Sequence, residues 1–200
     1  MKNTLFVLGL VLAILAVRGW ERRAHVYPPG VLVPEYPQQS ASARTGPIPV
    51  GDYVLTPRAD FRLRARVLSR EDYRWSDGAD LAPVDLALGW GVMSDQAVLD
   101  RIDITQGSRW YFTRYAHPAP ISDRQIIRNS ANMHLIPAND WVADKLDDVR
   151  ASDLVQLRGL LVDVDRSDGF YWRTSTTRED TGNGSCELFY VEHVHIEPRE

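Results

Sequence analysis

The fold class is decided by residues 61–67, which read Phe61-Arg62-Leu63-Arg64-Ala65-Arg66-Val67. Apolar side chains alternate with arginines along this stretch, and successive side chains of a β-strand point to opposite faces. The pattern therefore predicts a strand with one face in a hydrophobic core and one basic face.

Further strands are predicted in the C-terminal third. The apolar pattern of residues 155–164 changes phase at Gly159, which indicates a β-bulge and a bend in the strand. Turn residues at 165–169 lead into a short strand, and a polar loop at 179–185 precedes the apolar strand 186–196. This order is typical of a small, curved antiparallel sheet such as an OB-like barrel.

About three short helices are predicted between these strands. One begins at Ser94, one opens with the capping-box spacing of residues 122–125, and one is capped by Asn139 or Asp140. Apolar residues at helical spacing in 142–149 form the buried stripe of the third helix. The predicted fold class is therefore α+β.

The N-terminus carries an apolar run without charge at residues 4–17. With Arg18 reaching back to the interface and Trp20 at the headgroup level, residues 4–20 predict a transmembrane helix. A cleaved signal peptide is the alternative, but the small residues that cleavage needs do not follow the run. The expected feature is an uncleaved signal anchor over residues 1–24.

Half of the twelve prolines lie in residues 28–49, so residues 25–50 are predicted to be an extended tether. A single globular domain is expected over residues 51–200. Three arginines after the apolar run favour a cytoplasmic domain, whereas the short N-terminal tail resembles that of bacterial signal anchors. The predicted localisation is the bacterial inner membrane, single-pass, with a periplasmic domain.

Composition excludes several functional classes. The chain is 44% hydrophobic and 25% charged, as globular proteins are, and its net charge of −4 with interleaved signs argues against a nucleic-acid partner. Cys186 is the sole cysteine, which rules out an intrachain disulfide and a cysteine-based zinc site. No cofactor is expected.

His134 is the preferred candidate site, because polar residues there interrupt an otherwise apolar run. His134 could act as a general base with Asn132 nearby, or it could be a buried histidine satisfied by hydrogen bonds. Arg178, Asp180 and Glu187 complete the candidate ligand or partner site. Asp180 opens an Asp-Thr-Gly tripeptide, but its polar surroundings are typical of a turn.

Two other groups of residues suggest ligands. Arg62, Arg64 and Arg66 could form a stripe that binds an anionic ligand, or they could be a solvated strand face. His193 and His195 lie two apart on a predicted strand and could share a metal ion, but no third ligand accompanies them, so no metal is predicted.

Three segments, 85–91, 132–138 and 178–187, together resemble an uncharacterised bacterial membrane-anchored protein family with one N-terminal span and a compact domain. The resemblance covers about residues 50–196. It implies this architecture and a bacterial source. It brings no activity and no catalytic residue.

The predicted function is a membrane-tethered, non-catalytic binding or scaffold domain of the cell envelope. Its expected partners are the lipid bilayer, through residues 4–20, and a protein in or at the membrane. One alternative is an envelope hydrolase centred on His134 with Asp180 or Glu187 as its acidic partner. The other is anionic-ligand binding through the arginine-rich strand.

Overall fold

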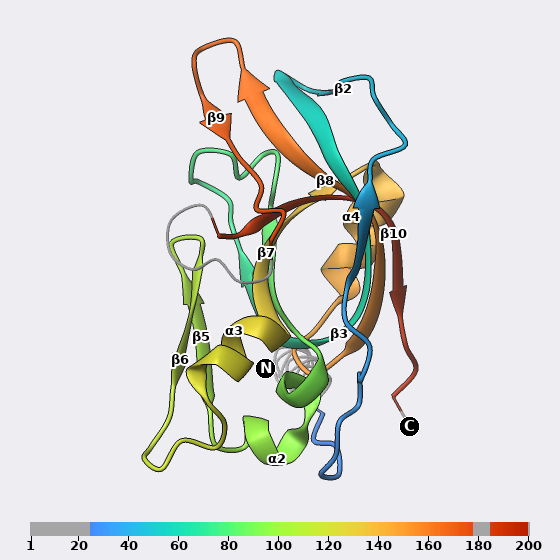
Figure 1. Ribbon diagram of the computed structural model, residues 1–200. Coiled ribbons are helices and arrows are strands. Elements are labelled where there is room, and N and C mark those ends of the chain that lie inside the picture. Colours follow the sequence, from blue (N-terminus) through green and yellow to red (C-terminus); the bar gives the residue numbers. More distant parts are fainter. Residues whose placement is uncertain (1–24, 178–184, 200) are drawn as a thin grey trace, which may run out of the picture.

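The computed structural model describes residues 25–177 and 185–199. Most of its strand residues belong to five strands that form a barrel: β3 (Tyr53–Asp72), β4 (Val84–Gly89), β7 (Ser130–Pro137), β8 (Leu154–Arg166) and β10 (Glu187–Ile196). The sheet closes because β3 pairs with both β4 and β8 (Figure 1).

The neighbour order around the barrel is β3-β4-β7-β10-β8 and back to β3. All pairs are antiparallel except β7 with β10, which is parallel. Numbered along the chain, the five barrel strands follow the neighbour order 1-2-3-5-4.

Smaller elements surround the barrel. The strands β1 (Gln38–Ala41) and β2 (Ile48–Val50) add to β3, β9 (Tyr171–Trp172) adds to β8, and β5 (Asp103–Gly107) with β6 (Trp110–Arg114) forms a separate hairpin. The helices are η1 (Gly91–Ser94), α2 (Gln96–Leu99), α3 (Asp123–Asn129) and α4 (Asp140–Asp148).

The barrel interior is the main hydrophobic core. The apolar residues of the alternating stretch 61–67 lie on β3, and their side chains point into this core. Helix α4 contributes Val142 and Leu146 to the same core, and its first turn is capped by the Asn139 side chain, which accepts from the Val142 N–H at 3.0 Å. The predicted helix and its cap are both present.

A second core covers the outer face of the barrel near the start of β3. A register shift between Pro57 and Ala59 turns Tyr53 and Leu55 to this face. Residues 160, 162 and 164 of β8 pack against them, while alternate residues of β8 face the barrel interior. The change of apolar phase along β8 therefore reflects burial of both its faces.

The expected bulge at Gly159 is thus not in β8 itself. The register shift lies on the neighbouring strand β10, between Val191 and His193. Gly159 is required for a different reason: a Cβ there would lie 2.0 Å from the carbonyl oxygen of Tyr190. The glycine lets β8 and β10 approach closely at the bend.

The proline-rich residues 33–50 contact the barrel. Val33 is fully buried in the main core, and its N–H donates to the Ser94 hydroxyl at 3.0 Å. Ser94 is therefore not a helix cap; the N-cap of α2 is Asp95, which accepts from the Ala97 N–H at 2.9 Å. With β1 and β2 paired to β3, this stretch is part of the folded unit.

The predicted α+β class with a transmembrane helix is wrong. The fold is 45% strand and 14% helix, and residues 130–137, where no strand was predicted, form strand β7. Alternation of polar and apolar side chains there has the period of a strand. Within residues 25–177 and 185–199, no helix has the length and apolar character needed to cross a membrane. The segment 4–20, on which the predicted anchor rested, lies outside the described residues.

Candidate functional site

The candidate site is a polar cluster on the outer face of β4 and β7. Asp85 and His134 lie directly opposite each other in the strand register. Their apolar neighbours point into the barrel, so both polar side chains point outward, yet they are only 0% and 2% exposed. His134 Nδ1 lies 2.9 Å from Asp85 Oδ2, outside hydrogen-bond geometry.

Arg109 reaches this pair from the tip of the β5–β6 hairpin. The two loop residues, Ser108 and Arg109, have φ angles of 53° and 69°. Such a two-residue loop twists correctly for a hairpin, but glycine or asparagine normally occupies it. Backbone strain of this kind is found where a side chain must be held in place for function.

The Arg109 guanidinium is held firmly on one side. Nη1 donates to Asp85 Oδ1 at 2.7 Å and to the Ala82 carbonyl at 2.9 Å. The backbone N–H of Arg109 donates to the Tyr73 hydroxyl at 2.9 Å. These bonds tie the hairpin to the loop between β3 and β4.

Aromatic rings enclose the same guanidinium. Its central carbon lies 3.7 Å from the Tyr73 ring centroid and 5.3 Å from that of Trp172, and such contacts stabilise a cation. The Trp172 ring also stacks on His134, with centroids 4.5 Å apart. Burial raises the pKa of the Tyr73 hydroxyl, so this ring stays neutral beside the cation.

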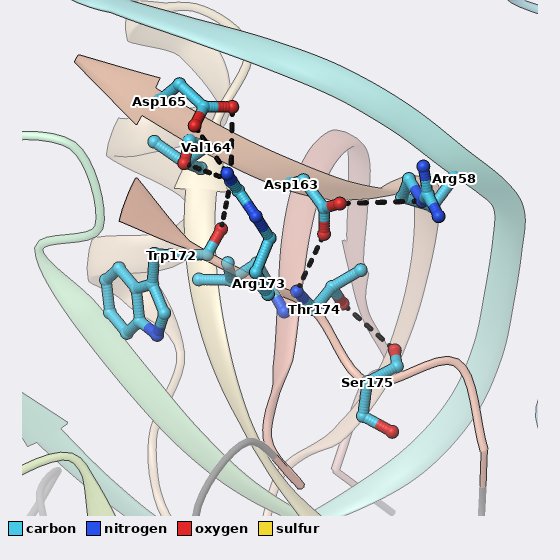
Figure 2. A network of polar contacts seen from close by, with 9 residues as sticks. Arg58, Asp163, Val164, Asp165, Trp172, Arg173, Thr174 and Ser175 are labelled. Atoms are coloured by element: carbon cyan, nitrogen blue, oxygen red, sulfur yellow. Dashed lines mark hydrogen bonds and ion pairs between the residues drawn. The ribbon is translucent and has the colours of Figure 1, made fainter. Parts of the chain in front are cut away.

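Trp172 is held in place by contacts of the polar residues that come directly after β9. Figure 2 shows its indole extending away from a network in which Arg173 donates to the Val164 carbonyl at 2.7 Å and pairs with Asp165. In the same network the Thr174 N–H donates to Asp163 at 3.0 Å. These contacts fix the short strand against β8.

Asn132 links the cluster to the hairpin. Its Nδ2 donates to the Arg109 carbonyl at 3.0 Å, and its Oδ1 accepts from Gln106 Nε2 at 2.6 Å. The cluster nevertheless leaves polar atoms unpaired. Among the described residues, the following buried side-chain atoms have no hydrogen-bond partner: Gln106 Oε1, Arg109 Nε, Arg109 Nη2 and His134 Nδ1. Buried polar groups are nearly always hydrogen-bonded, so this concentration calls for an explanation.

Two cavities meet at this cluster, and Trp110 and Cys186 line both. The first has a volume of about 470 Å³ and is lined by Arg109, His134 and Trp172. The second, of about 630 Å³, is lined by Asn132, Tyr111 and Glu187. Tyr111 shares a hydrogen bond of 3.0 Å with the Ser130 hydroxyl, and burial raises its pKa.

The structure brings together part of the predicted site. Asn132, His134 and Glu187 line these two cavities, whereas Arg178 and Asp180 lie outside the described residues. The carboxylate beside His134 in the described chain is Asp85.

The other predicted residues lie elsewhere. Arg62, Arg64, His193 and His195 line a groove over β3, β8 and β10. Arg66 is buried, and its Nη1 donates to the Ser94 carbonyl at 3.2 Å. It cannot take part in an exposed stripe. No group of three or more potential metal ligands occurs in the part of the chain that the structure describes.

Asp85, Arg109 and Trp172 are site residues that the sequence did not reveal. For Asp85 a signal existed, because it is the one charged residue in the apolar strand 84–89. For Trp172 the signal was the aromatic run of residues 170–172, because neighbouring rings on a strand point to both faces and can be exposed for a ligand. Arg109 gave no such signal, since it reaches the cluster only through the folding of distant loops.

In comparisons with protein-family models, curated proteins and solved structures, nothing matches this chain. Its chemistry is therefore argued from the geometry above.

Proposed function

We propose that the chain is a non-catalytic ligand-binding domain, with its site in the cavity lined by Arg109, His134 and Trp172. The observation that carries this proposal is the concentration of buried, unpartnered polar atoms at that cavity. Unsatisfied groups cost free energy in the empty protein, and a bound ligand can supply the missing partners.

The position of the cavity supports the proposal. OB-type barrels bind ligands on the face of their second and third strands, between the loops that follow the first and fourth. Here β4 and β7 are those strands. Tyr73 and Ala82 come from the first of the two loops and Trp172 from the second.

The lining residues indicate the chemistry of the ligand. Trp110, Tyr171 and Trp172 offer ring faces for a flat or cyclic group. The Nε and Nη2 edge of Arg109 matches the two oxygens of a carboxylate or phosphate. Both nitrogen atoms are buried, so binding requires a neighbouring side chain to shift. The proposed ligand is a small molecule that combines a ring with an acidic group.

A hydrolase centred on His134 is less well supported. The imidazole is 2% exposed and lies between Asp85 and the Trp172 ring. Among the described residues, no serine hydroxyl or cysteine thiol hydrogen-bonds to it. A nucleophile positioned by His134 is therefore missing from this part of the chain.

The test is a titration of the purified full chain followed by tryptophan fluorescence. Probes are a uronic-acid oligosaccharide, a nucleoside monophosphate and inorganic phosphate alone. We expect a saturable change with a ring-bearing probe and at least tenfold weaker binding by Arg109→Lys. This variant keeps a cation beside Asp85 but loses the flat two-nitrogen edge.

Arg101→Gln is the control, because Arg101 is exposed and, within the described residues, donates only to the Pro118 carbonyl. It should bind like the wild type. No saturable response to any probe, or equal weakening in both variants, would contradict the proposal.

A further inference from the structure

A row of opposed side chains runs across four neighbouring strands, β1, β3, β8 and β10. In the strand register Gln38 is opposite Arg62, Arg62 is opposite Arg158, and Arg158 is opposite His193. Directly opposed side chains on one sheet face have Cβ atoms about 5 Å apart. The row therefore places two guanidinium groups side by side, and like charges in this position destabilise a sheet.

No carboxylate among the described residues pairs with either arginine of this row. Arg62 Nε donates to the uncharged amide oxygen of Gln38 at 2.8 Å. No ion pair or hydrogen bond joins Arg158 to any side chain in the described chain.

The carboxylates nearby are already engaged. Glu197 lies 2.7 Å from Arg64, whose hydrogen bond holds the pKa of Glu197 below its usual value, and Glu35 lies 3.9 Å from Arg64.

Two further carboxylates also have other partners. Glu192 lies 3.8 Å from Arg44. Asp60 accepts from the Ser42 hydroxyl at 3.2 Å and from the Ala43 N–H at 3.3 Å. The charge of Arg62 and Arg158 is thus left without a counterion.

The row lies in a groove. Arg62, Arg158 and His193 line a concavity of about 550 Å³, together with His195 and the ring of Tyr36, which is 57% exposed. The charged residues of its lining are three arginines, Arg62, Arg64 and Arg158, and one carboxylate, Glu35. A concave surface with an excess of positive charge attracts anions.

We propose that this groove binds a tetrahedral oxyanion, the phosphate or sulfate group of a ligand, between Arg62 and Arg158. Guanidinium forks match the oxygens of such groups. A bound oxyanion contacts both arginines at once and replaces their repulsion with two charge-assisted hydrogen bonds. His193 stands next to Arg158 at the end of the row, where a ring N–H can donate to the oxyanion. The site is separate from the cavity at Arg109.

The experiment measures the thermal unfolding midpoint of the full chain at low ionic strength. Sodium sulfate and sodium phosphate are titrated in parallel, with sodium chloride at matched ionic strength. A ligand that binds only the folded state raises the midpoint in a saturable way. We expect this response with sulfate or phosphate and not with chloride, and the two titrations show which oxyanion is preferred.

Arg158→Gln should weaken the apparent affinity for the oxyanion at least tenfold. Without the anion, the same variant should unfold at the wild-type temperature or above it, because the opposed charges are gone. An unfolding midpoint that does not fall in this variant shows that the anion site is lost while the fold is intact.

Arg58→Gln is the matched control: the same charge is removed from an exposed residue of β3 that pairs with Asp163 at 3.5 Å. It should keep the wild-type response. An equal loss in both variants, or an equal response to chloride, overturns the proposal.

Discussion

At the scale of the residue, Asp85 organises the candidate site. It is fully buried and lies within 3 Å of both Arg109 and His134. A buried ion pair contributes little net stability compared with an apolar replacement, but loss of one partner leaves the other charge buried without compensation. Asp85 therefore matters because it holds Arg109 in place beside His134.

Replacing Asp85 with alanine should lower the free energy of unfolding by about 3–5 kcal/mol, because the Arg109 charge is left unpaired. Urea denaturation measures the change. Asp165→Ala is the control, since its pair with Arg173 is about half exposed on both sides and such pairs contribute about 0–1 kcal/mol. Similar losses in the two variants would show that the Asp85 pair is not effectively buried.

At the scale of the element, barrel closure depends on the contact between β8 and β10. These strands are joined across a register shift, and Gly159 is where their backbones come closest. A side chain at this position would meet backbone atoms, which cannot rotate away.

Gly159→Ala is expected to destabilise the protein by at least about 2 kcal/mol, within the range of severe packing errors. Gly107→Ala is the control, because a Cβ at this strand residue has no atom within 4 Å. That variant should change stability by less than about 1 kcal/mol. Equilibrium unfolding of both proteins tests the difference, and a mild effect of Gly159→Ala would refute the close approach.

The C-terminal end of β10 is bound to its neighbours through Glu197. Its carboxylate accepts from Arg64 on β3 at 2.7 Å and from Gln156 on β8 at 2.9 Å. The hydrogen bond from Arg64 lowers the pKa of Glu197 below its usual 4.5. A lowered pKa in the folded state stabilises the fold above the unfolded pKa, and this contribution is lost as the pH falls.

At pH 6 the wild type should therefore have a higher free energy of unfolding than Glu197→Gln. This difference in free energy should become smaller as the pH falls below about 4.5 toward 3. Urea unfolding at both pH values measures it. A difference in unfolding free energy that is the same at both pH values would show that the ionised carboxylate does not supply the stabilisation.

At the scale of the whole molecule, two hydrophobic cores share the same strands. β3, β7, β8 and β10 each contribute residues to the barrel interior and to the outer core. Neither core can be lost while the other keeps its strands in place, so the described chain should unfold as one cooperative unit.

Urea unfolding followed by tryptophan fluorescence and by far-ultraviolet circular dichroism should give coincident transitions. Trp90 reports on the barrel interior and Trp172 on the outer core. Separate midpoints would show that the two cores are independent.

The sequence by itself determined the local features. Alternation in residues 61–67 predicted the central strand, and the caps Ser122 and Asn139 marked where α3 and α4 begin. These features depend on neighbours within a few residues, which the sequence displays directly. Of the candidate site, His134, Asn132 and Glu187 were found because polar residues stood out among apolar ones.

Only the tertiary structure decided the rest. Closure of the barrel depends on pairing between β3 and β8, about a hundred residues apart along the chain, and no local pattern encodes a partner at that distance. The same holds for Asp85, Arg109 and Trp172, which belong to one site because three separate segments meet on one face. The predicted stripe of Arg62, Arg64 and Arg66 changed for this reason too. Strand register places Arg158 beside Arg62, whereas Arg64 pairs with Glu197 and Arg66 is buried, since neighbours across a sheet are set by pairing and not by spacing along one strand.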